Sequence, residues 1–357
     1  MPVHRCAYAP PGGGSVKKVK FWGAMAILVG ILARPEAAVA GAQRAMRLWY
    51  SSVAPAMFPF LALLPILTGP DACAAYDAVL SRFMRPFFRL PGAAAPALVI
   101  GMISGSPGGA LAVRQVAAGA GMRQSDARRL ALALSGVSPA YLILGVGQGL
   151  YGSLALGMKL AAIQVSIQLG LLILLRGMKE SKEERITSLP REELPRRPIQ
   201  SAVESVLAVC GYMVLFSSIC SVAASFVGES MGTALLLVFD LPSGVAELAR
   251  WEIPSKMLIQ GAAIGFGGLC IAAQNLDALR PLGVTAKEYL SMRGIASGLF
   301  AGISGFVLQA QSIGAEVYVG GGSRVYAFSL LIAGFIALPS LFFFTKTFCF
   351  NNWKKGA

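Results

Sequence analysis

Long stretches without any charged residue constrain the fold of this chain more than any other feature. Each is long enough to cross the roughly 30 Å hydrocarbon core of a bilayer as a helix of about 20 residues. Charged residues make up 13% of the chain, against about 25% in a soluble domain. The stretches run over Leu48–Pro70, Leu90–Val113, Leu130–Met158, Ser205–Gly228, Met257–Leu276, Gly294–Ala315 and Val325–Thr345. The pattern predicts an all-α polytopic membrane protein in a lipid bilayer.

Composition argues against several functional classes. The net charge of +14 comes from short basic segments beside apolar stretches, which is typical of cytoplasmic loops and not of a nucleic-acid partner. His4 is the single histidine, and the six cysteines form no Cys-x-x-Cys pair. Without paired carboxylates or a membrane-embedded histidine, we expect no enzyme, no catalytic residue, no metal and no cofactor.

A charged segment rich in proline, residues 176–200, divides the chain and predicts a cytoplasmic linker. The predicted organisation is a flexible leader, a first membrane repeat with an extra N-terminal helix, the linker, a second membrane repeat and a short tail. Their ranges are 1–20, 21–175, 176–200, 201–350 and 351–357. The first apolar run, Phe21–Ala33, follows basic residues as in a signal peptide. A retained first helix is favoured because many spans follow it.

The two halves share a pattern. Gly101-x-x-x-Gly105-x-x-Gly108 is matched by Gly261-x-x-x-Gly265-x-x-Gly268. After each comes a helix of equal spacing, from Gly121 to Ser135-Gly136 and from Gly283 to Ser297-Gly298, the latter opened by a capping box of Thr285 and Glu288. Small residues at this spacing also serve plain helix packing. The order of predicted crossings favours an inverted repeat with re-entrant helical hairpins.

The glycine-rich element Ser104–Gly109 is a poor helix. Pro107 lacks a backbone donor, and the glycines lower helix stability further. Broken backbone at membrane depth is tolerated inside protein or beside a water-filled cavity. Interrupted segments in corresponding positions of two halves indicate the binding site of a transporter.

Several short motifs, in order, resemble the sporulation integral membrane proteins that carry the nucleoside-recognition (Gate) domain. They are Val53–Phe60, Pro86–Gly92, Ser104–Ala110, Ser138-Pro139 and Gly265–Gly268, within a resemblance spanning about Phe21 to Phe344. The resemblance implies a fold related to concentrative nucleoside transporters. Its nearest branch, the stage V sporulation proteins, implies transport of dipicolinate across the outer forespore membrane. Ser106 and Leu111 stand where members often carry an aromatic residue and a lysine, so the substrate stays open.

Binding a small planar dianion requires hydrogen-bond donors and helix N-termini. The candidate substrate-binding residues are Ser104, Gly105, Ser106, Gly108, Ser135 and Ser138 from the first half, and Gly267, Gly268, Gln274, Asn275 and Ser297 from the second. Each serine has an alternative role, donating to a carbonyl of its own helix.

Some charged residues interrupt or separate the apolar stretches. Arg114 and Arg293 are either functional or extend to the membrane boundary. Glu229, Asp240 and Glu247 either bind a coupling ion or line a solvated loop.

The predicted function is membrane transport of a small organic anion, dipicolinate above all, in the membrane of a spore-forming bacterium. A carrier for a nucleoside or another polar solute, and a membrane scaffold of the spore envelope that transports nothing, are the alternatives. A homo-oligomer is compatible with each of them.

Overall fold

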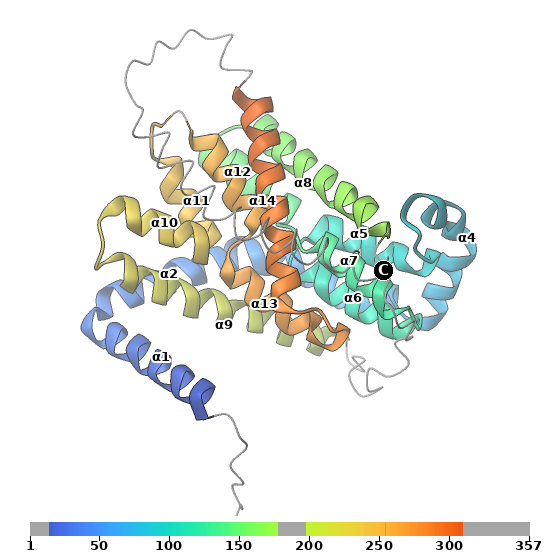
Figure 1. Ribbon diagram of the computed structural model, residues 1–357, viewed down its shortest axis with the longest axis horizontal. Helices are drawn as coiled ribbons and strands as arrows, with labels where there is room; N and C mark the ends of the chain where they lie inside the picture. The colour runs from blue at the N-terminus through green and yellow to red at the C-terminus, as the bar shows by residue number, and fades with distance from the viewer. Residues whose placement is uncertain (1–13, 178–197, 254, 310–357) are drawn as a thin grey trace, which may run out of the picture.

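The computed structural model describes residues 14–177, 198–253 and 255–309, and every regular element in these ranges is a helix (Figure 1). Within these ranges, three helices are long and apolar enough to cross a membrane, or up to five if each bent pair counts as one span. The all-α polytopic membrane architecture is confirmed. Most of the predicted leader and linker, the expected span Val325–Thr345 and the tail lie outside the described residues.

The first half contains α1 (Gly14–Ala33), α2 (Pro35–Leu48), the π-helical turn η1 (Trp49–Val53), α3 (Ala54–Leu67), α4 (Pro70–Phe88), η2 (Gly92–Ala94), α5 (Ala95–Ser104), α6 (Gly108–Gly119), α7 (Gln124–Leu134), the π-helix η3 (Tyr141–Leu150), α8 (Leu154–Leu174) and η4 (Leu175–Gly177). The second half contains α9 (Pro198–Ala224), α10 (Glu229–Phe239), α11 (Leu241–Ala249), α12 (Lys256–Phe266), α13 (Leu269–Leu279), η6 (Arg280–Leu282) and α14 (Ala286–Gln309).

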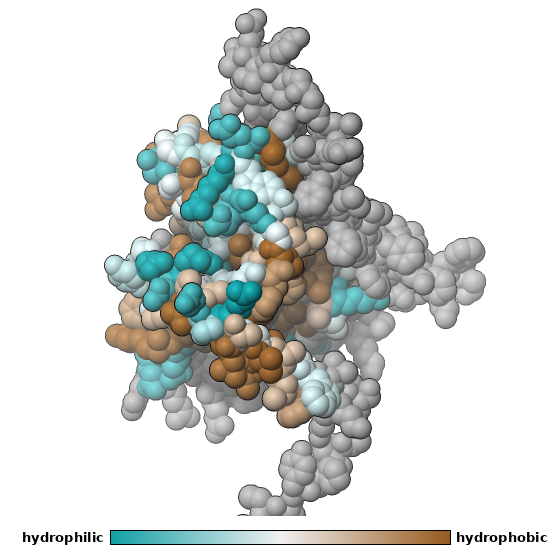
Figure 2. All heavy atoms as spheres, turned by 90° about the vertical axis from the view of Figure 1, so that its left-hand side faces the viewer, coloured by the Kyte–Doolittle hydropathy of each residue, from teal (hydrophilic) through white to brown (hydrophobic). Residues whose placement is uncertain are grey.

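The first helix and parts of the outer surface carry exposed apolar side chains. Helix α1 meets α2 at a bend of 100°. Helix α2 packs along α9, and just beyond α2 the indole N–H of Trp49, in η1, donates to Val206 O at 2.9 Å. Trp22 and Phe226 are 67% and 58% exposed. Figure 2 shows apolar side chains lying directly beside polar ones at the surface of this end of the molecule. The exposed apolar side chains suit a protein embedded in lipid.

The first predicted hairpin is present. Helix α5 ends at Ser104, α6 begins at Gly108, and the two helices pack against each other. The residues between them form the tip of the first hairpin, Gly105–Pro107. Gly105 has a φ of +62° and a ψ of −159°, a combination that essentially only glycine adopts. The expectation that Ser104–Gly109 is not a continuous helix is therefore confirmed.

The second half places its hairpin elsewhere than predicted. The chain reverses between α10 and α11 at Asp240, which ends α10 and directly precedes α11, while Pro242 occupies the first turn of α11. The glycine-rich element instead interrupts a single segment, Lys256–Leu282. Gly267 and Gly268, with φ values of +89° and +80°, end α12 without reversing the chain. The tip of the second hairpin is Asp240–Pro242.

The helices of the two halves therefore correspond to each other in a different order from the one that the glycine pattern predicted. Hairpin α5–α6 corresponds to α10–α11, the broken segment α7–η3 to α12–α13, and α8 to α14. The Tyr151 hydroxyl, after η3, donates to Gln260 Oε1 near the start of α12 at 2.6 Å. Gln124, at the start of α7, donates to Leu282 O beyond α13 at 3.3 Å. The two broken segments therefore run in opposite directions, as in an inverted repeat.

The structure does not pair α7 with α14, which the equal glycine spacing suggested. Both helices begin at the same end of the molecule, where Arg128 and Glu288 form an ion pair. Ser135 ends α7, whereas α14 continues through Ser297 and Gly298. The capping box at the start of α14 is confirmed, because Thr285 N donates to Glu288 Oε2 at 3.0 Å and Glu288 N donates to Thr285 Oγ1 at 3.3 Å.

Candidate functional site

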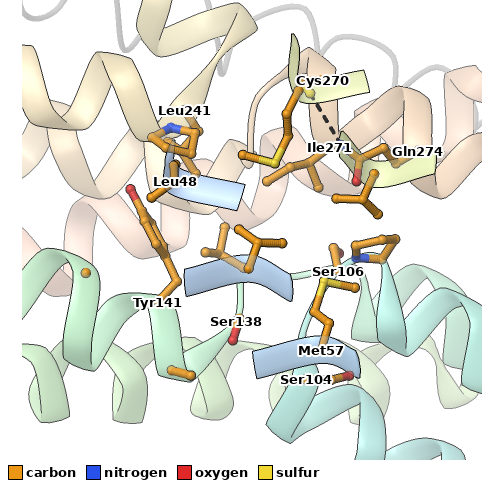
Figure 3. A pocket seen from close by; sticks show the side chains of 18 of the residues that line it. Leu48, Met57, Ser104, Ser106, Ser138, Tyr141, Leu241, Cys270, Ile271 and Gln274 are labelled. Carbon is orange, nitrogen blue, oxygen red and sulfur yellow. Dashed lines mark hydrogen bonds between the residues drawn. The ribbon is translucent and has the colours of Figure 1, made fainter. Parts of the chain in front are cut away.

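A cavity of about 560 Å³ lies where the two halves meet. It is bounded by both hairpin tips, the η1–α3 region, the start of η3, α9 and α13. Figure 3 shows Tyr141 at one end of the hollow and Ser106 and Gln274 at the other. The polar lining residues are Ser51, Ser104, Ser106, Ser138, Tyr141, Asp240 and Gln274, and most of the remaining lining is apolar, including Met57, Met213, Leu241 and Ile271. This is the usual make-up of a small-molecule site, an apolar wall with few polar groups.

The tip of the first hairpin packs directly on the break between α7 and η3, residues Ser135–Ser138. Ser106 N donates to Gly136 O at 2.9 Å. A Cβ built on Gly105 would lie 2.9 Å from the carbonyl carbon of Val137 and closer still to the backbone of Ser138. Only a residue without a side chain allows this approach, so the tip and the break form one unit.

Asn275 connects this unit to the second half. The side chain is fully buried. Its Nδ2 group donates to Ser106 Oγ at 2.8 Å and to the Tyr289 hydroxyl at 2.7 Å. Asn275 belongs to α13 and Tyr289 to α14, so a single amide joins the first hairpin to two helices of the other half.

The break between α12 and α13 is stabilised by a buried cation. Arg293 of α14 is 1% exposed. Its Nε donates to Phe266 O at 3.1 Å, and its Nη2 donates to Gly265 O. The guanidinium thus binds the carbonyls that α12 leaves unpaired at its C-terminus, where the helix dipole favours positive charge. Arg293 is thus buried inside the protein, where it stabilises the break.

In the first half, α8 is the helix that corresponds to α14, and its amide side chains contact the break between α7 and η3. Gln164 and Gln168 of α8 lie against Gly136, and they are 2% and 1% exposed. Both polar atoms of the Gln168 side chain lack a hydrogen-bond partner. The two breaks therefore differ in the side chains that contact them, and also in backbone form, because Gly267 and Gly268 have positive φ values and no residue of Ser135–Ser138 does.

The second hairpin tip also packs on a break, although less closely than the first. A Cβ on Gly268 would lie 3.3 Å from Leu241 N and from Leu241 Cβ. Each half thus presents a hairpin tip to an unwound stretch of helix. Irregular backbone of this kind at membrane depth is found where it lines a cavity or is covered by protein.

The structure brings part of the predicted site together. Ser104, Ser106, Ser138 and Gln274 line the cavity. The others, Gly105, Gly108, Ser135, Gly267, Gly268, Asn275 and Ser297, lie in the tips, breaks and contacts around it and do not line it. The contact of any of these residues with a solute stays a prediction.

Three of the predicted serines use their hydroxyl groups on backbone carbonyls. Ser104 donates to Ile100 O at 2.7 Å, Ser135 to Ala131 O at 2.6 Å and Ser297 to Ala262 O at 2.7 Å. Each hydroxyl keeps lone pairs for accepting a hydrogen bond. Their capacity to donate to a solute is therefore already taken up within the protein.

Tyr141 and Asp240 also line the cavity. The sequence did not select Tyr141, and it named Asp240 as a residue that either binds a coupling ion or lines a solvated loop. Asp240 is buried between α10 and α11, so the alternative of a solvated loop is wrong for this residue. Among the described lining residues there is no Lys or Arg. No group of three or more His, Cys, Asp or Glu residues able to hold a metal ion occurs within the described ranges.

The chain is similar to the sporulation integral membrane protein YlbJ of Bacillus subtilis (strain 168). The two are 24% identical over 318 residues, which cover 76% of this chain and 78% of that protein. No family model matches the chain, and no solved structure matches it. The apolar helices and this similarity together show an integral protein of a bacterial membrane.

Proposed function

We propose that this chain is a carrier that moves a small polar organic solute across a membrane of a spore-forming bacterium. The observation that carries the proposal is the cavity of about 560 Å³ between two hairpin tips and two broken helices. Its volume lies in the range of about 300–1,000 Å³ that is typical of small-molecule sites. Its walls come from both halves, which run in opposite directions, an arrangement typical of secondary transporters.

Dipicolinate is the solute to test first. The sequence resemblance implies it, and the similarity to a sporulation membrane protein of Bacillus subtilis supports a role in spore formation. The cavity of about 560 Å³ has the volume for a small planar ring, and Ser106 and Gln274 would supply polar contacts at one end.

A nucleoside or another neutral polar solute is the second candidate, and a specific observation favours it. The lining contains the carboxylate of Asp240 and the amide of Gln274 but, among the described residues, no cation. Carboxylates and amides accept hydrogen bonds from hydroxyl groups. A neutral solute would bind without the charge repulsion that Asp240 imposes on an anion.

Uptake of labelled dipicolinate into proteoliposomes tests the proposal, with labelled uridine measured in parallel. The blocking variant is Ala140→Trp, because Ala140 lines the cavity and the indole would fill much of it. The matched control is Ala155→Trp, since Ala155 is exposed on α8. We expect saturable uptake by the wild type and Ala155→Trp, and a loss of at least tenfold in Ala140→Trp.

Each outcome has a distinct meaning. Uptake of uridine but not dipicolinate would select the neutral solute. Equal uptake by both tryptophan variants would remove the pathway from this cavity. If well-folded wild-type protein moves neither solute, the scaffold alternative gains and the proposal loses its support.

A further inference from the structure

Asp240 is a buried carboxylate that faces the cavity from the second hairpin tip. It is 6% exposed, and its Oδ2 accepts a hydrogen bond from Ser243 Oγ at 2.7 Å. In the part of the chain that the structure describes, it forms no ion pair. An ionised carboxylate withdrawn from water is costly unless it is paired. Ionisable residues kept at membrane depth are therefore functional by default.

The groups around Asp240 do not neutralise it. The titratable or charged neighbours are Arg44 of α2, Tyr141 of η3, Cys220 of α9 and Cys270 of α13. Arg44 is exposed, and its guanidinium donates to Ser221 Oγ at 2.7 Å. The phenol and the thiols are uncharged near neutral pH. Asp240 thus has hydrogen-bond donors beside it but no counter-charge in contact.

An organic anion in the same cavity would meet this carboxylate as a like charge. Repulsion between like charges is strong in a site of low dielectric constant, and binding a proton removes it. We infer that Asp240 binds one proton each time an anionic solute occupies the cavity, so that the anion and the proton cross the membrane together. This inference rests on the proposed transport of an organic anion.

The proton balance of this step is simple. A proton from the side of entry adds to a carboxylate oxygen of Asp240 and converts the carboxylate to a carboxylic acid. The same O–H bond breaks on the side of exit, where the proton leaves with the solute. No covalent bond to the solute forms or breaks.

The test uses the full chain in proteoliposomes, with the membrane potential held at zero by equal potassium concentrations and valinomycin. Dipicolinate accumulation is measured with and without an inward proton gradient of one pH unit. One coupled proton supports about tenfold greater accumulation for such a gradient. The variants are Asp240→Asn and, as matched control, Glu247→Gln, because Glu247 lies on α11 outside the cavity lining and contacts Arg250.

We expect an accumulation ratio of about ten in the wild type and in Glu247→Gln, falling to about one in Asp240→Asn. A wild type that takes up dipicolinate with an accumulation ratio of one, or a ratio of ten that survives in Asp240→Asn, would overturn the inference.

A second measurement separates this inference from the proposed function. Infrared difference spectra between pH 5 and pH 8 record the carbonyl stretch of a protonated carboxyl group. A band present in the wild type and Glu247→Gln but lost in Asp240→Asn supports the proton site even if no variant carries dipicolinate. A wild type without such a band overturns it.

Discussion

Replacing Gly105 by alanine tests whether the first hairpin tip is locked onto the broken helix beneath it. The backbone at Gly105 has a φ of +62° and a ψ of −159°, and holding an L-residue there costs about 1–3 kcal/mol. The new methyl group would also overlap the backbone of Ser138 and lie 2.9 Å from the carbonyl carbon of Val137. Overpacking of this kind costs about 1–3 kcal/mol more.

The sum predicts that Gly105→Ala lowers the free energy of unfolding by about 2–6 kcal/mol. Reversible unfolding by sodium dodecyl sulfate in dodecyl maltoside micelles measures this change. Gly152→Ala is the matched control, because Gly152 also has a φ of +62° but no atom within 4 Å of an added Cβ. It should show the backbone strain without the collision, a loss of about 1–3 kcal/mol. If the two variants unfold at the same detergent fraction, the close approach of tip and break is refuted.

Two further predictions concern the side chains that contact the breaks. Arg293→Met leaves the carbonyls of Gly265 and Phe266 without their donors and should lower the free energy of unfolding by about 2–5 kcal/mol in the same assay. The control Arg280→Met, at an exposed position, should cost less than about 0.5 kcal/mol. Equal losses in the two variants would contradict the capping role of Arg293. Gln168→Met removes two buried polar atoms that have no partner, so the free energy of unfolding should stay the same or rise by about 1 kcal/mol. A decrease of the free energy of unfolding by more than about 1 kcal/mol would show that Gln168 has a hydrogen-bond partner in the membrane.

The sequence predicted those parts of the fold that depend on local chemistry. Pro107 and its neighbouring glycines cannot continue a helix, so the break at the first hairpin could be anticipated. The capping box of Thr285 and Glu288 fixed the start of α14 for the same reason. These signals act within a few residues and need no knowledge of the tertiary structure.

The features that the sequence did not predict depend on the direction that the chain takes after a break and on contacts between residues far apart in the sequence. A pair of glycines such as Gly267-Gly268 ends a helix, but neighbouring helices decide whether the chain then reverses or continues. The reversal at Asp240 relies on one capping position followed by Pro242, a pattern that is also common in plain loops. The contact of Asn275 with Ser106 joins residues from different halves, and no local pattern encodes it.

The contrast between Gln168 and Arg293 has an electrical consequence. The broken segments of the two halves run in opposite directions and approach the cavity from either side. A neutral amide contacts one break and a fixed positive charge contacts the other, while the carboxylate of Asp240 lies at the cavity wall. The electric field across the cavity is therefore uneven. A charged solute would experience a different potential at each end of its path, so inward and outward passage need not be energetically alike.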